Sequence, residues 1–172
     1  MNAYTNQNFT YVQNYFRTLA ELYQPIGHTD NNPKFFTDLQ EVLLSKTLNG
    51  KIMLCLREPS PVRNTGDNWM RNYTCTIIIV KNVSKEAFDA QEAVFNETEN
   101  DLYEIIARVK KDCDQVPVTQ RPFADYQKNE IPMDFIIPTG ADLWCGMKMK
   151  LTVLITIPRI NAITDAVWSP QS

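Results

Sequence analysis

The chain has 172 residues, a formal net charge of -3 and hydrophobic side chains at 44% of its positions. This length is sufficient for one domain with a substantial core, and the composition excludes a disordered, collagenous or mucin-like chain. The net charge is too small to indicate a nucleic-acid-binding protein.

Two amphipathic helices are predicted at the start of the chain, because apolar residues recur there at steps of three and four positions. The first helix begins at Phe9 and ends before Pro25. The second is shorter, starts at Phe35 and is stopped by Asn49 and Gly50, a residue pair that tolerates positive φ.

Two strands with a long loop between them follow. The segment Lys51–Arg57 is too short for a helix and is bounded by glycine and proline, which favours a strand. The segment Glu58–Trp69 is rich in Pro, Asn, Asp and Gly, and is predicted to be a long loop. From Tyr73 to Val83, threonines alternate with apolar residues before a continuous apolar run, as in a central strand.

A long helix is predicted over about residues 85–111, with Ser84 as its N-cap and apolar residues at seven-residue steps. Acids predominate in its early turns and bases at its end, which complements the helix dipole. This pattern indicates a solvated helix face rather than a binding site.

The rest of the chain is predicted to be a second long loop, two strands and a tail. Little periodicity is found over Cys113–Glu130. The segment Ile131–Ile137 is expected to be a short strand at an edge of the sheet, since Pro132 cannot donate to a strand ladder. Strict alternation over Cys145–Ile157 predicts a strand with one buried and one solvated face.

Together these elements predict an α+β protein, with a four-stranded antiparallel or mixed sheet and helices packed on one face as a two-layer sandwich. Residues 1–158 are expected to form the single domain. Residues 159–172 are expected to be an extension used in subunit contacts.

Cysteine content and hydropathy limit the environment of the protein. The four cysteines are widely separated, and three lie in predicted strands, so we expect reduced side chains that fill the core. No apolar run is long enough to span a bilayer, and no secretory signal is recognised, which predicts a cytosolic protein without membrane contact.

No catalytic signature is found in the sequence. Both phosphate-binding glycine patterns are missing, as is the nucleophile elbow of hydrolases. The lone histidine, His28, is predicted to be an exposed loop residue, and Glu97 and Asp101 lie one helical turn apart on an outer face where they could share a cation. We therefore expect no cofactor, no metal and no enzymatic activity, and keep an enzyme that uses these three residues as one alternative.

The predicted loops and tail are longer than a compact domain normally keeps. They carry residue types that are favoured at protein interfaces. The candidate interface residues are Arg63, Trp69, Arg71, Arg121, Phe123, Tyr126, Arg159 and Trp168. The alternative is that these segments fold back over their own sheet.

The order of elements resembles that of the tail terminator proteins of long-tailed bacteriophages and of related neck and head-completion subunits. The similarity runs through Phe35–Leu43, Ile52–Leu56, Thr76–Val80 and Glu97–Val109, and the same segments are similar to hypothetical virion genes of phages and prophages of the Bacteroides group. The family's subunits form a ring that caps the tail tube and joins it to the head connector, and they have no catalytic residue.

The resemblance therefore implies a virion structural protein, assembled in the host cytoplasm as a homo-oligomeric ring, most simply a hexamer. Its partners would be the tail tube and the connector or neck proteins, with genomic DNA only as passing cargo. The second hypothesis is a soluble α+β module that binds a small ligand or peptide in a pocket lined by Trp144, Lys148 and Lys150. Lysines on an exposed sheet face also serve simply to solvate it.

Overall fold

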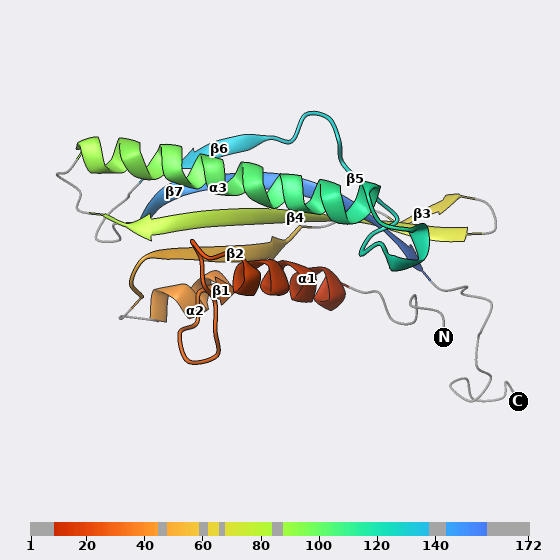
Figure 1. Cartoon of the computed structure of the whole chain (residues 1–172), viewed down its shortest axis with the longest axis horizontal. Helices are drawn as coiled ribbons and strands as arrows, with labels where there is room; N and C mark the ends of the chain where they lie inside the picture. The colour runs from red at the N-terminus through yellow and green to blue at the C-terminus, as the bar shows by residue number, and fades with distance from the viewer. Residues whose placement is uncertain are drawn as a thin grey trace, which may run out of the picture.

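The computed structural model describes residues 9–44, 48–58, 62–65, 68–83, 88–137 and 144–157. Within them, one mixed sheet carries helices on its faces, and the predicted α+β class is confirmed (Figure 1). In chain order the elements are α1 (Phe9–Leu22), β1 (Phe35–Phe36), α2 (Leu39–Leu44), β2 (Lys51–Arg57), β3 (Val62–Thr65), β4 (Asn68–Asn82), α3 (Phe88–Asp114), a 3-10 turn (Val118–Gln120), β5 (Asp125–Tyr126), β6 (Met133–Ile136) and β7 (Trp144–Ile157).

The sheet is built around β4 and β7, which pair antiparallel along nearly their whole length, from Trp69 opposite Ile157 to Asn82 opposite Trp144. The strand order is β1-β2-β4-β7-β5, with β3 also paired to β4 and β6 also paired to β7. Among the described strands, only β1 pairs in parallel. In the described ranges the sheet has seven strands where four were predicted, because the sequence patterns did not reveal β1, β3 and β5.

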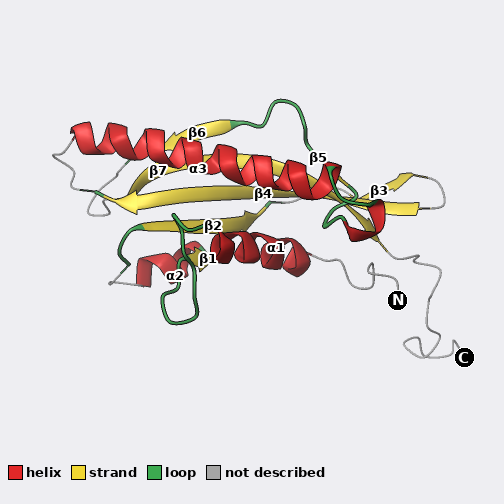
Figure 2. Ribbon diagram, viewed as in Figure 1, coloured by secondary structure: helices red, strands yellow, loops and turns green. Residues whose placement is uncertain are grey.

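The main core lies between α1, α3 and one face of the sheet, and Figure 2 shows these two helices side by side over the strands. The predicted alternation of β7 is confirmed, since its odd-numbered residues from Cys145 to Ile155 are buried. The largest fully buried side chains of this core are Phe16, Phe123, Met53, Ile77, Ile79, Leu102, Ile105, Met149, Leu151 and Ile155.

A second apolar cluster lies on the opposite face of the sheet. Val42 of α2 packs there with Ile52 and Leu54 of β2 and with Val80 of β4. Residues on β2 alternate between the two clusters, so both faces of this strand are covered. The helices therefore do not all lie on one face as predicted.

The second predicted helix is wrong in its first half. Phe35 and Phe36 form β1, and their side chains enter different clusters on the two faces of the sheet. The helix begins only at Leu39, where Asp38 accepts a hydrogen bond from the Gln40 backbone N–H. Two adjacent phenylalanines fit a strand covered on both faces as well as a helix stripe, so spacing did not distinguish them.

The predicted loop over residues 58–69 is also wrong, because this segment contains β3 and the start of β4. These two strands form a hairpin, with Val62 opposite Arg71 and Thr65 opposite Asn68. Since Thr65 pairs with Asn68, the two strands are separated by only two residues of sequence, which is the spacing of a hairpin rather than of a long loop.

The segment between α3 and β6 is folded against the core. It holds the 3-10 turn and β5, and its Phe123 is 1% exposed. The Phe123 ring contacts Tyr15 and Phe16 of α1, with centroids 4.8 Å and 6.5 Å away. The alternative that this segment covers its own sheet is thus the one the structure adopts.

Three further predictions, on the cysteines, the last strand and the edge strand, are confirmed. All four cysteines are free and buried, the last strand ends at Ile157, and β6 pairs only with β7 in the described part of the chain. The position of Ser84 lies outside the described residues. None of the described helices combines the length and apolar character needed to cross a membrane.

Candidate functional site

A network of charged side chains lies where α1, α3, β2 and β4 meet, and Asp101 is at its centre. Asp101 is 4% exposed, and one carboxylate oxygen lies 2.7 Å from the Lys51 ammonium nitrogen. The other accepts a hydrogen bond of 2.8 Å from the Tyr23 hydroxyl. Glu97, one turn earlier on α3, lies 3.6 Å from Lys51 and 3.5 Å from Lys81. Burial and the bond to Asp101 both raise the pKa of Tyr23.

This network bears directly on the hypothesis of a shared cation at Glu97 and Asp101. The structure brings the two carboxylates together, but the ammonium group of Lys51 binds both of them. The expectation that Asp101 lies on an outer face is wrong, because Lys51 covers it from β2. In the described part of the chain, no group of three or more His, Cys, Asp or Glu side chains is placed to hold a metal ion.

His28 lies in the connection between α1 and β1 and is buried, which corrects the prediction of an exposed loop residue. Its Nδ1 accepts hydrogen bonds from the backbone N–H groups of Lys34, at 2.9 Å, and Phe35, at 3.3 Å. Burial lowers the pKa of the imidazole, and the charge of Arg17 lowers it further. One nitrogen of His28 is thus engaged in holding the backbone that leads into β1.

The face of β7 opposite the main core carries compensated charges. Lys148 lies 3.0 Å from Asp134 on β6, and Lys150 lies 3.1 Å from Glu58. Glu58 also accepts a hydrogen bond from the Thr76 hydroxyl, and this bond and Lys150 together hold the pKa of the Glu58 carboxyl below its usual value. These lysines solvate the sheet face and join neighbouring strands.

An open hollow of about 330 Å³ lies further along the same face. It is lined by Asn72, Thr152 and Leu154 from the sheet and by Asp125, Tyr126 and Gln127 from the segment around β5. Trp144, Lys148 and Lys150, the residues predicted to line a pocket, do not line it. The sequence showed that Thr152 faces solvent but gave no indication that β5 pairs there, since β5 has only two residues.

The candidate interface residues fall into three groups. Phe123 and Tyr126 are 1% and 8% exposed and belong to the main core, so their side chains are covered within the subunit rather than at its surface. Aromatic residues are enriched both in cores and at interfaces, which is why the sequence did not separate the two roles. Tyr126 also donates a hydrogen bond to Asp114 at the end of α3.

Two of the candidate arginines, Arg71 and Arg121, are half-buried. Arg71 stacks over Tyr73, with its guanidinium carbon 4.9 Å from the ring centroid, and its buried Nε has no hydrogen-bond partner among the residues that the structure describes. Arg121 donates from its Nε to the Val116 carbonyl oxygen at 3.1 Å. Both lie toward the end of the molecule at which α3 stops.

The third group consists of residues that the structure describes only by their backbone or not at all. Arg63 and Trp69 belong to the β3–β4 hairpin, where Arg63 is opposite Met70 and Trp69 is opposite Asn64. Their side chains are not among those described. Arg159 and Trp168 lie outside the described residues.

Comparison of the sequence with known proteins assigns the chain to no family. No model of a protein family matches the sequence, and no curated protein matches it either.

Proposed function

We propose that the protein is a virion structural protein, a tail terminator or neck ring subunit that caps a phage tail tube and joins it to the head connector. The proposal begins from the resemblance in element order. It includes a homo-oligomeric ring, most simply a hexamer, that forms in the host cytoplasm and becomes part of the virion.

The observation that supports this proposal best is the projecting end of the sheet. Figure 1 shows β3 and the adjoining part of β4 reaching beyond the ends of α1 and α3. Among the described residues, β3 pairs with β4 alone, so its other edge presents backbone N–H and C=O groups. Such an edge is a template for pairing with another chain. Where it binds a different surface of the next identical subunit, the contact is heterologous and can close into a ring.

The charged side chains agree with a structural role. Asp101 and Glu97 are bound by lysines, and the nitrogen of His28 that could act as a base accepts two backbone hydrogen bonds. A general base needs a free acceptor within reach of a substrate proton. The groups of the enzyme hypothesis are thus used in holding the fold together.

The proposal is tested by measuring the mass of the purified protein over a wide concentration range, with light scattering and negative-stain images. We expect ring-shaped oligomers, either alone or after addition of tail tubes. A protein that stays monomeric under both conditions would contradict the proposal. A major tail protein or a portal encoded by an adjacent gene would support it independently.

The hollow beside β5 favours a second candidate function, a ligand- or peptide-binding module. Its volume of about 330 Å³ is at the small end of the range for ligand sites, and polar and apolar groups both line it. This hypothesis predicts a monomer whose melting temperature rises with a member of a metabolite panel. Thr152→Trp, which fills the hollow, should abolish that rise, and no response to any panel member would remove the hypothesis.

A further inference from the structure

An apolar patch lies along the flank of α3 that faces β6. Phe95 of α3 contacts Phe135 of β6 edge to face, with ring centroids 5.2 Å apart. Around this pair, Phe88, Phe135 and Ile137 are 77%, 57% and 67% exposed. Phe88 is two turns before Phe95 and so lies on the same flank of the helix. Single exposed apolar residues are common, but a cluster of them around one ring contact marks an interaction surface.

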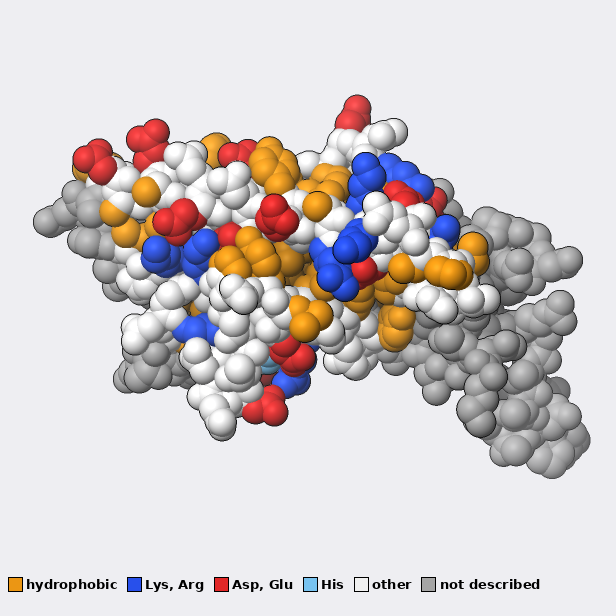
Figure 3. Space-filling model, viewed as in Figure 1, with side chains coloured by type: hydrophobic (Ala, Val, Ile, Leu, Met, Phe, Trp, Pro, Cys, Tyr) orange, Lys and Arg blue, Asp and Glu red, His pale blue; other side chains and the backbone are white. Residues whose placement is uncertain are grey.

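Negative charge borders this patch. From Phe88 to Glu104, α3 carries six acids and no base. Glu97 and Asp101 turn toward Lys51, but Asp89 and Glu92 are exposed beside the aromatic residues. Figure 3 shows acidic side chains spread over this half of the helix. A partner that covers the patch should therefore combine apolar and basic side chains.

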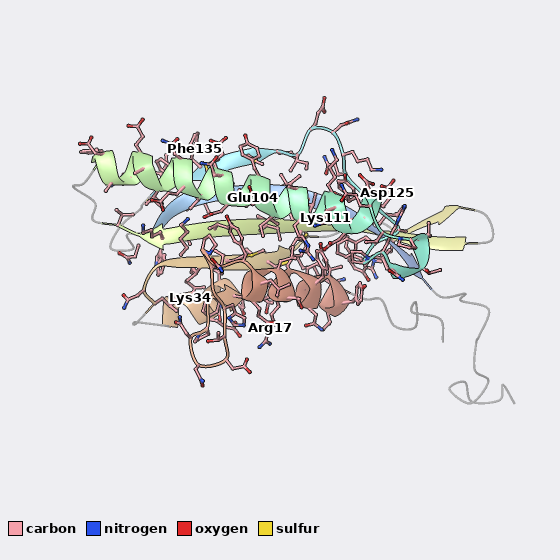
Figure 4. All side chains as sticks on the ribbon, in the orientation of Figure 1. Arg17, Lys34, Glu104, Lys111, Asp125 and Phe135 are labelled. Carbon is pink, nitrogen blue, oxygen red and sulfur yellow. The ribbon has the colours of Figure 1, made fainter. Side chains whose placement is uncertain are left out.

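The other end of α3 has this complementary chemistry. Lys110 and Lys111 are exposed, and neither forms an ion pair with any residue in the described ranges. Arg121 follows in the next loop, beside Val118, which is 64% exposed. Basic side chains gather over this half of the molecule in Figure 3, and Figure 4 places Lys111 on this half of α3 and Phe135 beside the other half.

We infer that a second copy of the chain docks on this patch, head to tail. The acidic patch, defined as Phe88, Asp89, Glu92, Phe135 and Ile137, binds the basic end of the neighbouring copy, defined as Lys110, Lys111, Val118 and Arg121. The two surfaces lie on opposite halves of one long helix, so the contact is heterologous and every subunit has one of each. This inference rests on the self-assembly in the proposed function and names the surfaces that carry it.

The test uses two charge-reversed chains. Asp89→Lys with Glu92→Lys gives a chain with two basic surfaces, and Lys110→Glu with Lys111→Glu gives a chain with two acidic ones. We expect each chain alone to self-associate at least tenfold more weakly than the unchanged protein, because like charges then face each other. An equimolar mixture should regain assembly, since the two chains can alternate.

Two further variants separate charge from apolar contact and from general effects on α3. Phe135→Ser should weaken assembly, whereas Glu104→Lys, a reversal on the same helix but on the flank toward α1, should leave it unchanged. Circular dichroism confirms that each chain is folded. The readout is the sedimentation coefficient at matched concentrations and low salt, where surface charges are least screened.

The outcomes distinguish this inference from the proposed function. If the unchanged protein assembles and the reversed chains assemble equally well, or if their mixture stays dissociated, the head-to-tail contact is wrong and the ring proposal stands. If the unchanged protein is monomeric with and without tail tubes, both are overturned.

Discussion

Gly146 lies in β7 opposite Val80, at a place where the two central strands leave no room for a side chain. A Cβ atom at Gly146 would lie 2.1 Å from the Ile79 carbonyl oxygen and 2.9 Å from the Val80 Cα. Both are backbone atoms, so they cannot rotate away. We expect Gly146→Ala to reduce the free energy of unfolding by about 1–3 kcal/mol, the usual cost of overpacking.

Urea denaturation measures this cost, and Lys148→Ala in the same strand is the control. That variant removes an ion pair between partly exposed side chains and should cost less than about 1 kcal/mol. Equal stability of Gly146→Ala and the unchanged protein would show that β4 and β7 separate more easily than their register implies.

His28 gives the protein a dependence of stability on pH. Its pKa is lowered in the folded chain by burial, so the unfolded chain takes up the proton first as the pH falls. The contribution of His28 to stability is therefore fully present above its unfolded pKa of about 6.5, and it is lost as the pH falls toward the lower pKa of the folded chain. Protonation also removes the acceptor for the Lys34 and Phe35 backbone N–H groups.

The measurement is urea denaturation at about pH 7.5 and about pH 5, on either side of the ordinary histidine pKa. His28→Leu should be less stable at the higher pH, because it leaves two backbone donors without an acceptor. It should also lose less stability between the two pH values than the unchanged protein. The same loss in both proteins would mean that His28 does not titrate as described.

Individual side chains were predictable where their own strand set their environment. The odd residues of β7 are buried as their alternation indicated, and the cysteines fill the core. His28 and Asp101 were not predictable, because the groups that bury them come from other segments. The local sequence gives the residue type and its position on an element, but segments distant in sequence determine whether the side chain is exposed.

At the scale of elements, the bond between Lys51 and Asp101 joins β2 to α3, and Tyr23 adds the end of α1. Asp101→Ala would leave an ammonium group that is 14% exposed without its nearest carboxylate. We expect a loss of about 3–5 kcal/mol in the free energy of unfolding, as for other buried pairs that lose one partner. Thermal and urea denaturation measure it.

Two companion variants test the cause of this loss. Glu97→Ala removes a carboxylate that is 46% exposed and should cost less than about 1 kcal/mol. Lys51→Met combined with Asp101→Leu removes both charges and should be more stable than Asp101→Ala alone. If the double variant is the least stable of the three, the Lys51 and Asp101 side chains contribute to the free energy of unfolding by more than the attraction between their charges.

Long elements with a sustained period were predictable, and of the described strands with four residues or fewer only β6 was predicted. The boundaries of α1, β2 and β7 follow the patterns closely, and α3 ends three residues later than expected. The strands β1, β3 and β5 have two to four residues each, too few to show alternation. They form because the backbones of β2, β4 and β7 pair with them, and the sequence of a short strand does not show which partner it will have.

For the whole molecule, the packing of helices on one sheet was predictable from element order, but the helix on the second face and the hollow beside β5 were not. Its lining comes from β4, β7 and the segment around β5, which are distant in sequence. The patch on α3 and β6 was likewise hidden, because the seven-residue spacing of Phe88 and Phe95 reads as a core stripe. The sequence pattern identifies the apolar flank of α3, but only the packed structure shows that Phe88 on this flank is exposed.

Removal of residues 158–172 tests whether this extension is needed for self-assembly but not for folding. Among the described residues, both apolar clusters lie within residues 9–155, so we expect a chain that ends at Ile157 to keep its circular dichroism spectrum and to melt cooperatively near the unchanged temperature. Since we expect the extension to make subunit contacts, the shortened chain should assemble more weakly, as light scattering measures. A shortened chain that folds and assembles like the full one would restrict the subunit contacts to the domain itself, where the free edge of β3 and the two charged surfaces on α3 both lie.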